Sequence, residues 1–161
     1  MRDYQQTALS LAEEILAGNR RAKTRLDQLC RAFRAAFLNY TPETPNHWRH
    51  PRNTWGTFPD LPSQGSCVML VICAAKHCGY DTEKWDELVY AYHQFLGAMS
   101  KSLSAEERVY ACYGTTAAAC LYDDPHFALL AKEWDPGTYV PESRDGQRAK
   151  AVLEKIQSHP L

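Results

Sequence analysis

Apolar residues recur every three or four positions along most of the chain, a spacing that predicts amphipathic helices. Start and stop signals divide this pattern: Ser104 opens a capping box, Asp124 precedes a proline, and Gly18 follows an apolar stretch. The predicted helices cover about residues 4–16, 19–38, 67–78, 81–99, 104–121, 124–134 and 143–157. With about six or seven helices and no convincing strand, we predict an all-α fold, a single compact helical bundle over residues 1–161.

One segment, Cys67–Ala75, is apolar at every position. A helix tolerates this composition only when other helices surround it, and a buried strand is the alternative. Because the segment continues through Lys76 and His77 to a glycine stop at Gly79, the pattern favours a helix in the centre of the bundle.

Between the second and third predicted helices, residues 39–66 lose the helical periodicity and form one long Pro- and aromatic-rich loop. Such a length is typical of functional or disordered segments, and its aromatic residues argue against disorder. Five prolines stiffen the loop, and its large aromatic residues alternate with arginines, as in interface hot spots. The residues that we expect to bind a partner are Trp48, Arg49, Arg52, Trp55 and Phe58. The alternative is that the tryptophans fill gaps in the core.

Charge is distributed unevenly along the chain. The total is −1, but residues 19–52 hold eight basic and two acidic residues, a net charge of +6 that leaves −7 for the rest. Helical spacing places Arg20, Lys23, Arg31 and Arg34 along one face, although Asp27 in its middle weakens the field. This face predicts a protein partner with an acidic surface. A solvated face without a partner is the alternative, and nucleic acid is a weaker candidate because the whole chain is not basic.

The six cysteines do not form a recognisable metal motif. Cys73 and His77 are four positions apart, but the chain has no Cys-x-x-Cys pair, so we expect no metal and no cofactor. Neither an export signal nor an apolar run of roughly 20 residues is present, which predicts a cytoplasmic protein with reduced cysteines and no membrane association.

Gln64-Gly65-Ser66-Cys67 stands at the predicted start of the apolar helix. This segment resembles the one in papain-like cysteine peptidases in which a nucleophilic cysteine opens a helix. The resemblance implies that Cys67 is a thiolate nucleophile and that His126 and Asp135 are its catalytic partners. The alternative is a buried cysteine that belongs to the core.

Together these features favour a non-enzymatic interaction module, similar in kind to inhibitors, immunity factors or adaptors, that binds an acidic protein partner. A cysteine-nucleophile enzyme built on Cys67 is one alternative. A weak nucleic-acid binder that uses the basic second helix is the other.

Overall fold

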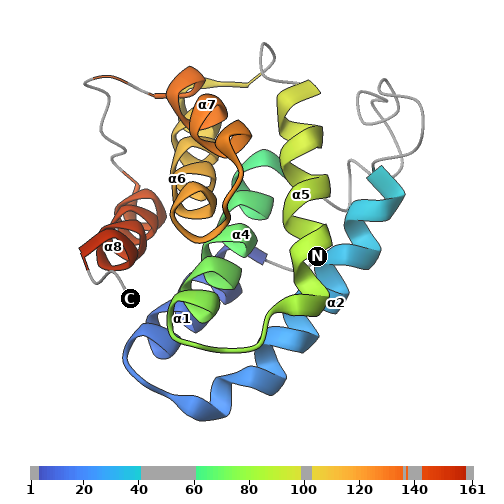
Figure 1. Cartoon of the computed structure of the whole chain (residues 1–161), viewed down its shortest axis with the longest axis vertical. Helices are drawn as coiled ribbons and strands as arrows, with labels where there is room; N and C mark the ends of the chain where they lie inside the picture. The colour runs from blue at the N-terminus through green and yellow to red at the C-terminus, as the bar shows by residue number, and fades with distance from the viewer. Residues whose placement is uncertain (1–3, 41–60, 99–102, 136, 138–142, 159–161) are drawn as a thin grey trace.

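The computed structural model describes residues 4–40, 61–98, 103–135, 137 and 143–158 (Figure 1). These residues form seven α-helices and one short 3-10 helix, and they contain no strand. The elements are α1 (Tyr4–Leu16), η1 (Arg20–Ala22), α2 (Lys23–Tyr40), α4 (Leu61–His77), α5 (Glu83–Ala98), α6 (Ala105–Leu121), α7 (Pro125–Glu133) and α8 (Arg144–Ser158). The predicted all-α bundle is therefore confirmed. None of the helices in these ranges combines the length and apolarity required to cross a bilayer.

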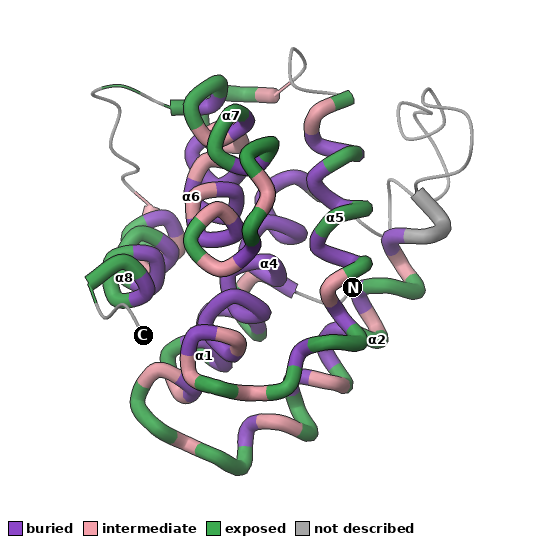
Figure 2. Tube along the Cα trace, viewed as in Figure 1, coloured by how far each residue is buried: buried purple, intermediate pink, exposed green. Residues whose placement is uncertain are grey.

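Helix α4 forms the centre of the bundle. It packs against α1 and α6 along its length and also contacts α2, α5 and α8. Every residue from 62 to 75 is buried, as the continuous purple tube of α4 in Figure 2 shows. The uniformly apolar segment 67–75 is thus a surrounded helix rather than a strand, as predicted.

The position at which α4 begins differs from the prediction. The helix starts at Leu61, so residues 39–40 and 61–66 are helical and the predicted loop of 39–66 was too long. The helical pattern is hidden there because the buried positions hold Ser63, Gln64 and Ser66 rather than apolar residues. Pro62 is compatible with a first helical turn, where a backbone N–H has no helical acceptor. Residues 41–60 lie outside the described residues.

Local signals set the other helix ends largely as expected. Ser104 and Glu107 form a reciprocal capping box on α6, and the Asp124 side chain accepts a hydrogen bond from the His126 N–H at the start of α7. Gly18 and Gly79 have φ of 96° and 86°, a backbone conformation that favours glycine and ends α1 and α4.

Candidate functional site

The four basic residues predicted to share one face do not form a single array. Arg20 lies in η1 rather than in α2, and its guanidinium donates a hydrogen bond to the Cys78 carbonyl at 3.3 Å. Lys23 forms an ion pair with Asp27 at 2.9 Å. Both side chains therefore have partners within the protein, and the basic face is reduced to Arg31 and Arg34 in the middle of α2.

Asp27 connects α2 to α5 through hydrogen bonds and ion pairs. Its carboxylate accepts a hydrogen bond from Trp85 Nε1 at 2.9 Å and pairs with Lys84 at 3.1 Å, in addition to Lys23. Partial burial alone would raise the pKa of Asp27, but these hydrogen bonds outweigh it and hold the pKa below its ordinary value. This carboxylate stays ionised at neutral pH and offsets the charge of Lys23.

Arg31 and Arg34 remain as the basic pair of α2. Both side chains are exposed, and neither forms an ion pair with any of the described residues. They lie three positions apart and so share one side of the helix. Residues 41–60 follow directly after α2, and they contain all five predicted loop contacts, Trp48, Arg49, Arg52, Trp55 and Phe58, which fall outside the described residues.

Gln64, Gly65 and Ser66, which suggested a peptidase, instead hold three helices together. The side-chain carbonyl of Gln64 accepts a hydrogen bond from the Tyr4 N–H at 3.0 Å, which satisfies the first turn of α1. The ring of Tyr92 lies directly against Gly65, where a Cβ would come within 2.2 Å of it. The Tyr92 hydroxyl donates to the Pro62 carbonyl at 2.8 Å and lies 3.3 Å from Ser66 Oγ.

Cys67 is not at a helix N-terminus, as the resemblance required. It is in the second turn of α4 and has no exposed surface, whereas His126 and Asp135 are exposed on and after α7. A nucleophile must contact its substrate, so this burial does not support catalysis by Cys67. The prediction that Cys67 opens a helix was wrong because α4 begins six residues earlier.

The remaining cysteines are distributed over several environments. Cys30 and Cys73 are buried, and this burial raises the pKa of both thiols, whereas Cys120 is exposed. Across the described ranges, no group of three or more His, Cys, Asp or Glu side chains is close enough to hold a metal ion.

A polar pocket that the sequence did not predict lies where the N-terminal turns of four helices meet. Its volume is about 450 Å³, and it is formed by the beginnings of α1, α4, α6 and α8. The residues that line it are Gln5, Gln6, Ser63, Ser104, Glu106, Glu107, Tyr110, Ser143, Arg144 and Asp145. Most are polar, which distinguishes this pocket from the apolar interior beneath it.

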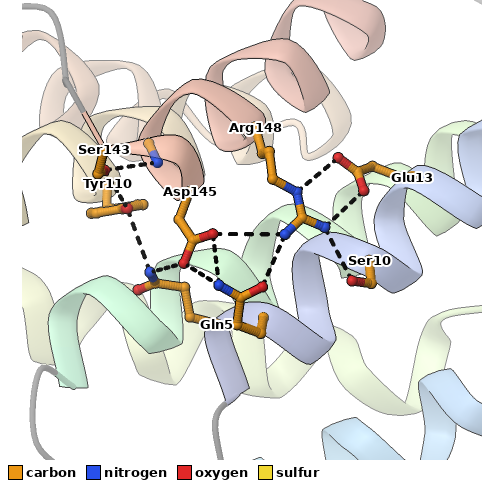
Figure 3. A network of polar contacts seen from close by, with 9 residues as sticks. Gln5, Ser10, Glu13, Tyr110, Ser143, Asp145 and Arg148 are labelled. Carbon is orange, nitrogen blue, oxygen red and sulfur yellow. Dashed lines mark hydrogen bonds and ion pairs between the residues drawn. The ribbon is translucent and has the colours of Figure 1, made fainter.

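Hydrogen bonds fix one wall of this pocket (Figure 3). Tyr110 Oη lies 3.5 Å from Ser143 Oγ, which in turn donates to Glu106 Oε1 at 3.0 Å. Asp145 accepts hydrogen bonds of 2.8 and 2.7 Å from the side-chain amides of Gln5 and Gln6. Burial raises the pKa of Tyr110 to about 12, so its hydroxyl is protonated at neutral pH.

Arg148 joins α8 to α1 beside the pocket. Its guanidinium donates to both carboxylate oxygens of Glu13 at 3.0 and 2.7 Å, to Ser10 Oγ at 3.0 Å and to Gln6 Oε1 at 3.0 Å (Figure 3). The hydrogen bond from Arg148 lowers the pKa of Glu13. Arg148 also forms an ion pair with Asp145 at 3.6 Å within α8, so Asp145 is contacted both from its own helix and by Gln5 and Gln6 of α1.

The sequence contains part of the signal for this pocket. Ser104 and Glu107 were interpreted only as the capping box of one predicted helix, and the helix starts near residues 4 and 143 were predicted without reference to one another. Their convergence depends on contacts between residues as much as 140 positions apart, such as Gln5 and Asp145, and no local pattern encodes it.

No family model matches the chain, and neither the curated proteins nor the solved structures include one that is significantly similar to it.

Proposed function

We propose that this protein is a non-enzymatic interaction module that binds an acidic surface of a protein partner through Arg31 and Arg34 of α2 and the segment 41–60. Inhibitors, immunity factors and adaptors are the kinds of protein that this mode of action fits. The observation that carries the proposal is the pair Arg31 and Arg34, exposed and without ion pairs among the described residues, on a helix whose other charges are largely engaged.

Two physical arguments support a partner on this side. Arg25 pairs with Glu14 at 2.7 Å and Lys23 with Asp27, so the fold neutralises basic residues where acids are within reach. Arg31 and Arg34 lack such an acid, and arginine is the side chain best suited to bidentate contact with a partner's carboxylates. The segment that follows supplies Trp48 and Trp55, of the residue type that dominates interface hot spots.

Photo-crosslinking tests the proposed surface. We place a benzophenone amino acid at Ala35, which is exposed beside Arg34, and expect it to capture an acidic partner in the native lysate. Arg31→Gln with Arg34→Gln should reduce this capture about 3- to 30-fold, as expected for removal of two charges at an interface. The matched control, Lys150→Gln with Lys155→Gln on α8, makes the same change in net charge and should leave capture unchanged.

Equal loss in both double variants would show an effect of net charge alone and would contradict the proposed surface. Capture of nucleic acid instead of protein, with an affinity that falls steeply as salt rises, would favour the nucleic-acid alternative.

The tryptophans provide a separate test. Trp48→Ala or Trp55→Ala should weaken partner binding by about 30-fold or more, while the melting temperature changes little, because each is proposed to be a hot spot rather than a core residue. Calorimetric melting and the crosslinking yield at Ala35 measure the two quantities. A large loss of stability in both variants would indicate that these side chains fill the core, and would remove them from the proposed surface.

A further inference from the structure

His93 lies on the side of α5 that faces α7, and its ring contacts Phe127 edge to face with the centroids 4.9 Å apart. We propose that His93 is a pH-sensitive switch: when its ring binds a proton, the contact between α5 and α7 opens and exposes Phe127. The switch is separate from Arg31, Arg34 and the segment 41–60, and it does not depend on the proposed partner interaction.

The two nitrogens of the His93 ring have different surroundings. Nδ1 lies 2.8 Å from the Val89 carbonyl, which can only accept a hydrogen bond, so Nδ1 carries the hydrogen of the neutral ring. Nε2 is buried and has no hydrogen-bond partner among the described residues. A proton that binds to the neutral ring therefore binds at Nε2, where the new N–H meets no acceptor. This position accommodates the neutral ring but not the imidazolium.

The groups around His93 do not compensate a positive charge. On α7, the exposed His126 opposes a charge on His93, and no carboxylate among the described residues acts on the ring. On α5, the neighbouring Tyr92 is an uncharged phenol whose hydroxyl donates to the Pro62 carbonyl. Because an unpaired charge in an apolar interior is costly, the protonated ring gains free energy when it reaches water.

Helix α7 is attached to α6 by hydrogen bonds but to α5 by side-chain packing. Arg108 of α6 donates to the Glu133 carbonyl at 2.9 Å, and Cys112 Sγ donates to the Ala131 carbonyl at 3.6 Å. Toward α5, Phe127 provides a ring contact, and no hydrogen bond or ion pair joins the two helices within the described ranges. Helix α7 can therefore separate from α5 while it stays on α6, over which it lies in Figure 1.

Helix α5 is fixed on its other sides. Trp85 Nε1 donates to Asp27 of α2, and the Tyr92 hydroxyl donates to the Pro62 carbonyl of α4. Helix α7 has nine residues and no comparable bond to α2 or α4 among the described residues. We therefore expect α7 rather than α5 to move when His93 is protonated.

Phe127 is the centre of an aromatic cluster that this movement exposes. Its ring centroid lies 5.1 Å from that of Tyr90 and 5.9 Å from that of Tyr122. Tyr90 already reaches the surface at 38% exposure, whereas Phe127 is 1% exposed. Acidic pH would thus extend an existing aromatic edge into a larger apolar surface.

Native-state hydrogen exchange of the full chain tests this proposal. Burial, with a smaller contribution from His126, lowers the pKa of His93 to about 4, and hydration in the open form would return the pKa to about 6.5. Protection factors of the α7 amides, corrected for intrinsic exchange, should therefore fall about 50-fold between pH 7 and pH 4.5. A local opening exposes little surface, so α7 exchange should respond less to urea than α4 exchange does.

Variants assign this pH dependence to one ring. His93→Leu should retain the protection of α7 at pH 7 and abolish the 50-fold change. His126→Gln is the matched control, because it removes the exposed histidine of α7, and it should retain most of the change. His93→Gln does not titrate and keeps a donor for the Val89 carbonyl, so it replaces His93→Leu if that variant does not fold.

Three results would overturn the proposal. The first is protection of α7 that does not change with pH. The second is a pH dependence that persists in His93→Leu or His93→Gln. The third is exchange of the α7 and α4 amides with the same free energy and the same response to urea at pH 4.5, which would indicate global unfolding alone.

Discussion

Helices α4 and α8 pack against the same two neighbours, α1 and α6, but by different means. Helix α4 is buried on every side, and its contacts depend on small residues and close backbone approach. Helix α8 buries only one stripe of residues, and a network of polar side chains connects its first turns to α1 (Figures 2 and 3). The comparison shows two ways in which a helix is fixed in the same bundle.

The packing around α4 leaves little space for an additional side-chain atom. A Cβ at Gly114 of α6 would lie 3.1 Å from the Ser66 carbonyl oxygen of α4, and one at Gly65 would overlap the ring of Tyr92. Tyr92 is fully buried and stacks edge-to-face on Phe33 and Phe37 of α2. The ring has no free space into which it could move, because close-packed interiors transmit such shifts to their neighbours.

The packing of α8 depends on an apolar stripe on one face and on the charged Arg148 at its margin, and less on the volume of its side chains. Its buried stripe consists of Gly146, Ala149, Val152, Leu153 and Ile156, with exposed polar residues opposite. Arg148 is at the margin of this stripe, only 17% exposed at its side chain, and directs its guanidinium across to α1. We therefore expect substitutions on the two sides to differ in size and in their dependence on chemistry.

The largest effect is expected from Gly65→Ala. The new methyl group overlaps the Tyr92 ring, so either the ring or α4 must shift, and the Tyr92 hydroxyl loses its bond to the Pro62 carbonyl. We expect a loss of about 4 kcal/mol in the free energy of unfolding, from overpacking and a lost buried hydrogen bond. Urea unfolding followed by circular dichroism measures this loss.

The matched control is Gly97→Ala in α5. There a Cβ meets only the side chain of Leu130 at an ordinary 3.8 Å, so alanine should be neutral or stabilising by up to about 1 kcal/mol. A loss below about 1 kcal/mol in the free energy of unfolding of Gly65→Ala would mean that the contact between Gly65 and the Tyr92 ring is less tightly packed than we describe.

His93 is a buried ionisable group at the contact between α5 and α7, so this contact should depend on pH. His93 is 1% exposed, its Nδ1 lies 2.8 Å from the Val89 carbonyl, and its ring packs edge-on against Phe127 of α7. Its Nε2 has no hydrogen-bond partner in the part of the chain that the structure describes. Burial, with a smaller contribution from the nearby His126, lowers the pKa of His93 to about 4.

The sign of the pH effect follows from this shift. Since the folded pKa is below the unfolded value of about 6.5, the unfolded chain binds the proton more readily between these values. The contribution of His93 to the free energy of unfolding should be fully present above a pH of about 6.5. It should fall by about 3 kcal/mol as the pH decreases to about 4. His93→Leu removes this contribution, so the difference between the two proteins in urea unfolding from pH 7 to 4.5 isolates it. Parallel pH curves would contradict the assignment.

A smaller loss is expected from Arg148→Met, which keeps the apolar stem but removes the guanidinium that joins α8 to α1. Its partners are partly exposed, with the Glu13 side chain at 47%, so we expect about 1 to 2 kcal/mol rather than the cost of a fully buried ion pair. Thermal unfolding provides the measurement, and Arg148→Lys should retain part of the stability.

Arg144→Met is the control on the same helix. Arg144 is exposed and forms no ion pair with the residues described, so its replacement should change stability by less than about 0.5 kcal/mol. If Arg144→Met and Arg148→Met cost the same, the network in Figure 3 contributes little and α8 is held by its apolar stripe alone.

Much of the fold could be predicted because helix signals are short-range. The apolar steps of α5, the capping box at Ser104 and the proline after Asp124 each involve residues within a few positions. The start of α4 could not be predicted in the same way, since Ser63, Gln64 and Ser66 disguise its buried face. The burial of Gln64 and Ser66 is tolerated because Tyr4 and Tyr92 supply them with hydrogen-bond partners.

The candidate sites differ in the same respect. The exposed pair Arg31 and Arg34 was part of the predicted basic face. The position of Asp27 within that face was visible in the sequence, whereas the contact of Arg20 with the Cys78 carbonyl, 58 positions away, was not. The polar pocket was not predicted at all, although the capping box at Ser104, which contributes to its lining, was identified as a helix signal. Side chains from four separated segments line it, and their distances are properties of the packed bundle.

By itself, the sequence determined the all-helical class, the central position of the apolar segment 67–75 and most helix ends, because these follow from periodicity and from side chain–backbone bonds within one or two turns. Only the tertiary structure decided which basic residues have no ion pair among the described residues. It also decided that the ring of Tyr92 lies against Gly65 and that the beginnings of four helices enclose a polar pocket. Contacts such as those of Ser66 with Tyr92 and of Gln5 with Asp145 join residues 26 and 140 positions apart, so they exist only once the whole core has packed.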